Sequence, residues 1–383
     1  MEHRQGETQP PPPAKAVISS IPDGKHRLRA EYLSTNSEDL LRVVVPAVQS
    51  RAQIENSNMV LNGQMPTSNP IPCSPHFKIE KLTEGVFAAI AADGGAAISN
   101  SGIIDLGGRT LIYDTFMTPK AAQDLRDAAH KLTGRDPGFI VNSHYHNDHI
   151  WGNQVFDPQA LVFSTSRTLR LIQTEGREEL DWARRSAAKR LEEFRRQYDE
   201  AADDRERSEL LTWVEYYQGL AEAVPHLDVR LPDITFEDRL SIHGSSRTVE
   251  LIPFEEAHTG NDSILHLQAD GIIFMADLLF VNCHPFLAEC DVHKLLEALK
   301  TIQTMQATIL VPGHGALGTS RDLELNMDYI AMCVETAQEL VAEGDTSAER
   351  IAQEKFPEKF ANWELSRFFS INLQSLCEKF GSR

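Results

Sequence analysis

One short segment constrains the fold and chemistry of this chain more than any other feature. His144-Tyr145-His146-Asn147-Asp148-His149 follows directly after the apolar run Phe139-Ile140-Val141. That run has the character of a strand, so the segment is predicted to be a loop held at the end of a strand, where functional residues concentrate. The first two imidazoles stand at i and i+2 of an extended segment and therefore point to the same side. Three histidines and an aspartate in six residues argue strongly against an accidental polar turn.

Three further positions place His or Asp at or just after predicted strands. His258 follows one strand, and His314 follows another in Pro312-Gly313-His314-Gly315. Asp277 closes the apolar run 272–276, where a carboxylate is costly to bury unless it is paired or bound to a metal. Each position alone is a weak signal. Together with the first segment they supply five His and two Asp near strand ends.

This set of residues resembles the ligand motif of the metallo-β-lactamase-fold hydrolase superfamily. His144-x-His146-x-Asp148-His149, followed by His258, Asp277 and His314, has the order typical of that superfamily, and the resemblance covers roughly residues 78–320. It implies an α+β fold, an αββα four-layer sandwich with two packed sheets, helices outside and the site at one edge. The motif is specific for the superfamily and says little about the substrate, because one fold hosts many reactions.

The resemblance also implies how the residues share two metal ions. It assigns to the first ion the three histidines His144, His146 and His258. It assigns to the second ion Asp148, His149 and His314, and Asp277 bridges both ions. Imidazole and carboxylate ligands suit two Zn²⁺ ions, with Fe or Mn as alternatives. Members dedicated to antibiotic hydrolysis carry Cys or another non-carboxylate at the bridging position. Asp277 therefore resembles the glyoxalase II, lactonase and RNase branches.

The implied activity is that of a binuclear zinc-dependent hydrolase. Two metals can share a hydroxide that exists at neutral pH and attacks a carbonyl. We expect a small-molecule acyl substrate (a lactam, lactone, ester or thioester), with Asp148 orienting the hydroxide and His284 donating to an oxyanion or a leaving group. Further candidates are Tyr145, Asn147, Trp151 and Asn282 for the substrate wall, and Asp262 as a partner for a ligand imidazole. The alternatives are a phosphodiesterase or nuclease of the same fold and a non-catalytic metal-binding protein.

Charge and composition limit the partners. The chain has 37 Lys and Arg against 56 Asp and Glu, a net charge of −19, so we expect no nucleic acid and no membrane as partner. No apolar run approaches the roughly 18–20 residues needed to span a bilayer, and the N-terminus lacks the apolar region of a secretory signal. Five cysteines without a CxxC pair favour a reducing compartment, so we expect the protein to be cytoplasmic.

The chain is predicted to have four parts. Residues 1–14 are a disordered Pro-rich tail, 15–77 an N-terminal extension or strand-exchanging arm, 78–320 the catalytic domain, and 321–383 a helical C-terminal extension. Within the catalytic domain, apolar residues at helical spacing over 166–224 predict an inserted hairpin of two long helices. The hairpin is expected to cover the metals as a lid or to contact a second subunit. A homo-oligomer would form through the insert or through the N-terminal extension.

Overall fold

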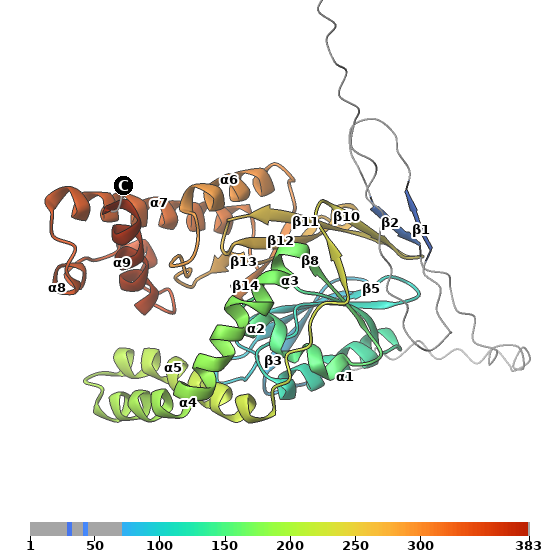
Figure 1. The fold of residues 1–383 in the computed structure, drawn as a ribbon, viewed down its shortest axis with the longest axis horizontal. Helices are drawn as coiled ribbons and strands as arrows, with labels where there is room; N and C mark the ends of the chain where they lie inside the picture. The colour runs from blue at the N-terminus through green and yellow to red at the C-terminus, as the bar shows by residue number, and fades with distance from the viewer. Residues whose placement is uncertain (1–28, 33–40, 45–70, 382–383) are drawn as a thin grey trace, which may run out of the picture.

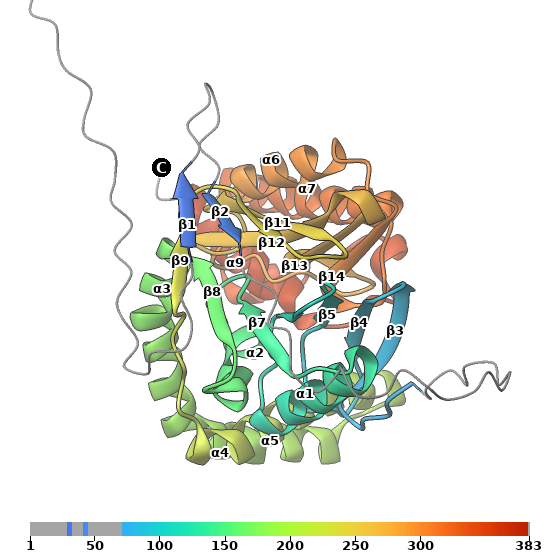
Figure 2. The same cartoon turned by 90° about the vertical axis from the view of Figure 1, so that its right-hand side faces the viewer.

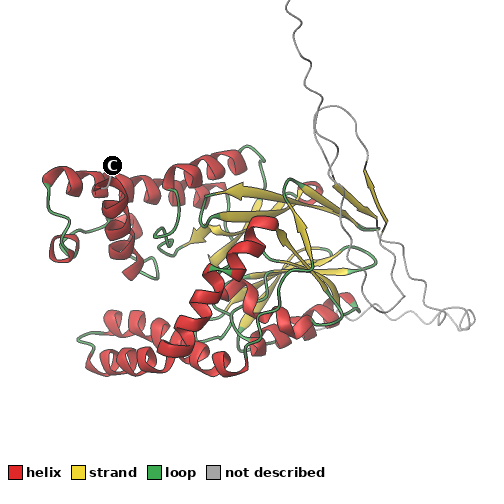
Figure 3. Cartoon of the chain, viewed as in Figure 1, coloured by secondary structure: helices red, strands yellow, loops and turns green. Residues whose placement is uncertain are grey.

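Two packed sheets form the centre of the molecule. The computed structural model describes residues 29–32, 41–44 and 71–381. Within these residues, two seven-stranded sheets have the orders β3-β4-β5-β6-β7-β8-β9, here the N-terminal sheet, and β1-β2-β10-β11-β12-β13-β14, here the C-terminal sheet. Helices cover the outer faces of the sheets (Figures 1 and 3). The αββα sandwich that the sequence predicted is confirmed.

The N-terminal sheet begins with antiparallel pairs and continues with parallel ones. Its strands are β3 (Phe77–Thr83), β4 (Val86–Ala91), β5 (Ser101–Asp105), β6 (Thr110–Tyr113), β7 (Pro137–Val141), β8 (Leu161–Thr165) and β9 (Ile234–Phe236). Neighbours from β3 to β6 pair antiparallel, and those from β6 to β9 pair parallel. Strands β5 and β6 form an antiparallel hairpin. Its turn contains Gly107 at φ +91°, a conformation that glycine adopts without steric cost.

The C-terminal sheet combines the second half of the domain with two strands from the N-terminal extension. Its strands are β1 (Arg29–Tyr32), β2 (Leu41–Val44), β10 (Leu240–His243), β11 (Thr248–Glu255), β12 (Asn261–Leu267), β13 (Ile272–Val281) and β14 (Ile309–Gly315). Strand β2 pairs parallel to β10, so this part of the extension joins the chain's own sheet. The predicted tail at 1–14 lies outside the described residues, as does most of the extension.

The helices fall into outer layers, an insert and a C-terminal group. They are α1 (Pro119–Thr133), α2 (Asn147–Ile150), α3 (Ser166–Gln173), α4 (Glu175–Glu200), α5 (Asp204–Ala223), α6 (Val292–Gln303), α7 (Ser320–Glu343), α8 (Ala348–Ile351) and α9 (Arg367–Gly381). Helix α1 begins where Thr118 accepts a hydrogen bond from the Ala121 N–H, and it ends at Gly134 in the left-handed conformation. Within the described residues, no helix combines the length and apolar composition needed to cross a membrane.

Alternating side chains explain why the layers pack as they do. In β4, Val86 and Ala88 face the core between the two sheets, whereas Phe87 and Ala89 face α1. This period of two gives each inner strand two buried faces. On the other side of the molecule, α6 and α7 pack on the C-terminal sheet (Figure 2). The sandwich thus holds its strand ends, and the loops that follow them, in fixed positions.

The predicted helical insert is confirmed as a hairpin of α4 and α5, which the shorter helix α3 precedes. Its apolar stripe is largely satisfied within the hairpin and against the sandwich. Phe194 and Tyr217 stack at 5.1 Å between ring centroids, and Leu220 is fully buried. At its outer side the hairpin meets the C-terminal segment, because Ser366 donates to Glu209 at 2.7 Å. Assembly of subunits through the insert or the extension stays a prediction.

Candidate metal centre

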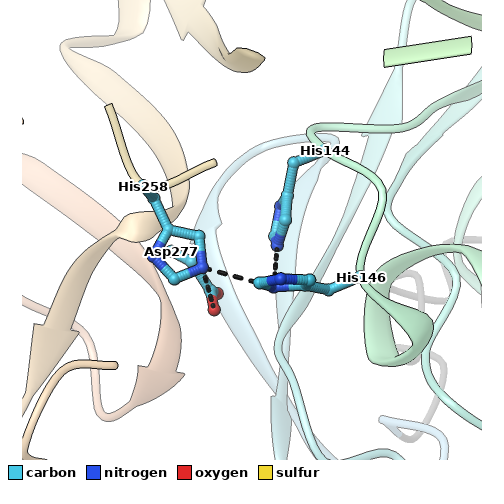
Figure 4. Close-up of side chains that lie close together, drawn as sticks. All are labelled: His144, His146, His258 and Asp277. Atoms are coloured by element: carbon cyan, nitrogen blue, oxygen red, sulfur yellow. Dashed lines mark hydrogen bonds and ion pairs between the residues drawn. The ribbon is translucent and has the colours of Figure 1, made fainter. Parts of the chain in front are cut away.

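The seven predicted ligands converge from distant parts of the chain into two adjacent groups. One group contains His144, His146, His258 and Asp277, and the other contains Asp148, His149 and His314. Within each group the ligand atoms lie within 4.8 Å of one another. Figure 4 shows the first group, with the rings of His146 and His258 directed toward each other beside Asp277.

The sandwich brings these residues to one edge. The loop after β7 carries His144 and His146 and leads into α2, whose first turn carries Asp148 and His149. His258 lies in the loop between β11 and β12, and His314 lies near the end of β14.

The position of Asp277 differs from the prediction. It lies inside β13 and does not close it, because pairing with β14 resumes beyond it at Phe280 and His314. The register of that pairing shifts between Ala276 and Phe280, and Ala276 has a φ of +46°. This irregularity, and not the end of the strand, presents the carboxylate of Asp277 to the histidines.

The first group directs three imidazole nitrogens and one carboxylate oxygen toward a common point. His146 Nδ1 lies 3.1 Å from His144 Nε2 and 3.3 Å from His258 Nε2. His258 Nε2 also lies 3.4 Å from Asp277 Oδ2. Burial lowers the pKa of His144 well below its usual value and that of His258 to about 4. His144 and His258 are therefore neutral at pH 7, which is the state that binds metal, whereas Glu289 outweighs burial and raises the pKa of His146 to about 9.

The second group has carboxylate oxygens on both sides of an imidazole nitrogen. His149 Nε2 lies 3.0 Å from Asp277 Oδ1 and 3.6 Å from Asp148 Oδ2. His314 Nε2 lies 3.3 Å from Asp148 Oδ2 and 3.3 Å from Asp277 Oδ2. Asp277 therefore faces ligands of both groups, as a bridging carboxylate must.

Two buried atoms indicate that a cation fits between these groups. His149 Nδ1 contacts Asp114 Oδ2 at 2.8 Å, and a proton on Nδ1 leaves a lone pair on Nε2. That lone pair faces Asp277 Oδ1, and both atoms are buried without a hydrogen bond among the described residues. Burial lowers the pKa of His149, but Asp277, Asp148 and Asp114 together raise it well above its usual value, so this position favours a positive charge, which a proton or a metal ion can supply. The imidazole and carboxylate donors suit zinc, and they accommodate iron or manganese as well.

Asp114 is a functional residue that the sequence analysis did not find. It is fully buried and accepts hydrogen bonds from the Ser143 N–H and the Ser143 hydroxyl, each at 2.8 Å, in addition to the His149 contact. Such a carboxylate sets the tautomer and the orientation of a metal-binding imidazole. A signal was present, because Asp114 directly follows the apolar strand β6, the same pattern that singled out Asp277.

Glu289 is the second residue that was missed. Its Oε2 lies 3.3 Å from His146 Nε2 and accepts a hydrogen bond from the Tyr145 hydroxyl. Burial alone would raise the pKa of Glu289, but its contacts with His146 and Tyr145 lower it to about 2. No motif marks Glu289 in the sequence. It lies between β13 and α6, and only tertiary structure brings it to His146.

The structure corrects the prediction for His284. This side chain is fully buried, its Nδ1 lies 2.8 Å from the Tyr329 hydroxyl, and its ring packs on Phe356 and Trp363. Its backbone N–H donates to the Glu364 carbonyl, which directs the residue into the C-terminal group of helices and away from the metal ligands. His284 therefore does not donate to an oxyanion or a leaving group.

The other candidates for the substrate wall divide into two kinds. Tyr145 and Asn147 line the cavity over the metal ligands. Trp151 is buried in the core, and Asn282 is exposed outside the cavity. Asp262 accepts from the Thr259 N–H and hydroxyl and is not the partner of the His258 imidazole.

A cavity of about 1070 Å³ lies over the two groups of ligands. Asp148, Asp277, His146 and His314 contribute to its lining, as do residues 91–95. Helices α4 and α5 and residues 361–368 complete its walls. In Figure 1 the insert and the C-terminal helices lie on the same side of the sandwich. Access to the ligands therefore passes between the insert and the C-terminal segment.

One protein family and several solved structures are similar to this chain. Residues 94–314 match the family described as the metallo-beta-lactamase superfamily. Similar solved structures include the metallo-beta-lactamase from Pontibacter korlensis (15% identity, TM-score 0.48, covering 67% of this chain and 99% of that one). They also include the DIM-1 metallo-beta-lactamase (15% identity, TM-score 0.48, covering 67% of this chain and 98% of that one). A third is the mono-zinc form of FIM-1 from Pseudomonas aeruginosa (13% identity, TM-score 0.47, covering 69% of this chain and 98% of that one). Because the family match spans more than half of the chain, this protein belongs to the metallo-β-lactamase superfamily.

Proposed function

We propose that this protein is a binuclear zinc-dependent hydrolase that cleaves a small acyl compound, namely a lactam, lactone, ester or thioester, at its carbonyl. The observation that supports this proposal is the pair of adjacent ligand groups that share Asp277. Two Zn²⁺ ions bound there would supply a nucleophile from water at neutral pH and would polarise the carbonyl.

The residues of the chain hold and orient the reacting groups. Asp114 fixes His149 with its Nε2 toward the second group, and Glu289 contacts His146 at the Nε2 atom, which faces away from the first group. Asp148 turns Oδ2 toward His149 and His314, which leaves Oδ1 to orient the attacking water. Tyr145 and Asn147 border the cavity and position the acyl group.

Two alternatives are weaker. A phosphodiesterase or nuclease would bring phosphates into a cavity whose walls carry many carboxylates, and like charges repel. A non-catalytic metal-binding protein would have no need of a large cavity that leads directly to the ligands.

The test combines a panel of substrates with one variant in the metal centre. Zinc-loaded protein is assayed with chromogenic lactams, lactones, thioesters and a bis-aryl phosphate. We expect turnover of at least one acyl compound and a rate at least about 1000-fold lower for His146→Ala, since loss of the metal removes both nucleophile and electrophile. Elemental analysis should show less bound zinc in that variant.

The matched control is His130→Ala, which removes an exposed imidazole that contacts Asp136 beside α1. It should retain zinc and activity. Turnover of the phosphate alone, no turnover of any compound, or full activity of His146→Ala would each overturn the proposal.

A further inference from the structure

The walls of the cavity are strongly acidic. Besides the ligands Asp148 and Asp277, seven carboxylates line it: Asp93, Glu175, Glu179, Glu209, Glu215, Glu289 and Glu364. Among these lining residues, all within the described part of the chain, there is no Lys or Arg. A site for an anionic substrate would carry at least one such cation opposite the substrate's charge.

Within the described residues, no Lys or Arg nitrogen forms an ion pair with any of these seven carboxylates, and Glu289 pairs only with His146. Burial and the neighbouring Asp93 raise the pKa of both Glu215 and Glu364. Neither residue has a hydrogen bond or ion pair with a metal ligand in the described structure. Metal binding therefore does not explain why these two carboxylates line the cavity. Their mutual repulsion is a cost to the folded protein that a bound cation would relieve.

Glu179 is a largely buried carboxyl group at the cavity wall, and its burial raises its pKa to about 7. Its Oε1 accepts a hydrogen bond from Asn147 Nδ2 at 2.6 Å. Its Oε2 is buried at the cavity wall and has no hydrogen-bond partner among the described residues. An unpaired buried carboxylate oxygen is costly, and a ligand donor can satisfy it.

Aromatic rings complete the lining. Trp213, Phe286 and Phe368 contribute to the wall near the carboxylates, with 5.7 Å between the ring centroids of Trp213 and Phe368 and 5.2 Å between those of Phe286 and Phe368. Aromatic faces attract cations through their quadrupoles, most strongly where water is excluded. Carboxylates and aromatic rings together are a combination suited to ammonium groups.

We propose that the natural substrate is a cationic acyl compound, whose ammonium or guanidinium group binds the acidic and aromatic cavity while its carbonyl lies at the metal centre. This inference rests on the proposed function and names the substrate class of the same site. It disfavours acyl compounds whose remote end carries a carboxylate or phosphate, since that group would face the unpaired carboxylates of the cavity wall.

Three thioesters with the same acetyl group and leaving groups of different charge provide the test. Acetylthiocholine is cationic, 3,3-dimethylbutyl thioacetate is its neutral isostere, and S-acetyl-3-mercaptopropionate is anionic. With zinc-loaded protein we expect kcat/KM to be at least about 10-fold higher for the cation than for the isostere, and lowest for the anion. A difference of this size is expected because one or two desolvated contacts hold the cation. The preference should shrink as salt is added, because salt screens charges.

Variants show whether the cavity causes the preference. Glu215→Gln combined with Glu364→Gln should lower the ratio of cationic to neutral kcat/KM by about 3-fold to 10-fold. The matched control is Glu222→Gln, on α5 but outside the cavity, which should leave the ratio unchanged. Equal ratios in all three proteins would overturn the inference, as would a neutral isostere that reacts as fast as the cation. In both cases the hydrolase proposal would stand.

A binding measurement separates the two proposals if no thioester reacts. In calorimetry on zinc-loaded protein, benzyltrimethylammonium should bind one to one, more weakly in the double variant, and phenylacetate should not bind. That result would support a cation-binding cavity, whereas the hydrolase proposal is overturned only if the other acyl compounds of the panel also fail to react. Equal or tighter binding of phenylacetate would overturn the proposal that the cavity binds cations.

Discussion

Replacing Asp114 by Asn tests how the protein prepares its second metal position. Asn has nearly the same volume as Asp and tolerates the left-handed backbone, which is φ +59° at this residue. Its Oδ1 can still accept from the Ser143 N–H. The amide NH₂, however, would replace Oδ2, which contacts the Ser143 hydroxyl and His149 Nδ1. A donor would then face a donor at His149 Nδ1.

The imidazole can escape this conflict by moving its proton to Nε2. That proton would occupy the lone pair that faces Asp148 and Asp277, the position proposed for the second ion. Loss of such an orienting partner typically costs 10-fold to 100-fold in metal affinity. This corresponds to about 1.4–2.7 kcal/mol. The first ion should be affected much less, because its histidines do not contact Asp114 directly.

The assay is a competition titration of metal-free protein with zinc against a chromophoric chelator. For Asp114→Asn we expect one ion at nearly unchanged affinity and a second weakened 10-fold to 100-fold. The control is Asp105→Asn, at the end of the adjacent strand β5, whose carboxylate pairs with Arg135. Two ions bound by Asp114→Asn with the affinities of the unmodified protein would refute the reasoning.

Three further predictions address the bridge, the buried histidine and the insert. Asp277→Asn keeps the side-chain volume but removes the charge shared by both groups. Elemental analysis should therefore show loss of metal, while the metal-free protein still folds. Full metal content would contradict the bridging role. Burial lowers the pKa of His284 to about 4 in the folded protein. As the pH falls, this histidine therefore binds a proton in the unfolded chain before it does so in the folded protein. Between about pH 6.5 and pH 4 this should destabilise the chelator-treated protein by about 3 kcal/mol. Most of that loss should be absent in His284→Asn, and parallel urea-unfolding profiles for the two proteins would argue against it. Leu220→Ala should lower the free energy of unfolding by about 2–5 kcal/mol, because Leu220 is fully buried between the insert and the sandwich. Leu211 lies on the same helix and is 39% exposed, so Leu211→Ala should lower the free energy of unfolding by less than about 1 kcal/mol.

The fold and the ligand set were accessible from the sequence because the ligand motif resembles that of a known superfamily, and local patterns placed the motif on strands and loops. Alternating apolar runs such as 86–91 mark strands, and the spacing within His144–His149 places ligands on one loop. The sequence predicted that His314 follows a strand, whereas in the structure it lies near the end of β14, where the sheet fixes its position.

Residues whose role depends on distant contacts were not accessible. His284 stands close to Asp277 in the sequence, yet the backbone pairing with Glu364 turns it toward Tyr329 and out of the site. Glu289 belongs to no recognisable pattern and reaches His146 only because the loop after β13 folds over the metal edge.

The character of the cavity was decided by tertiary structure alone. Its acidic wall combines Asp93 from the N-terminal sheet region, Glu215 from the insert and Glu364 from the C-terminal segment. In the sequence each is one of 56 acidic residues and resembles any solvated surface charge. Charges act through distance in space, and only the packing of the insert and the C-terminal segment over one sheet edge brings these carboxylates together.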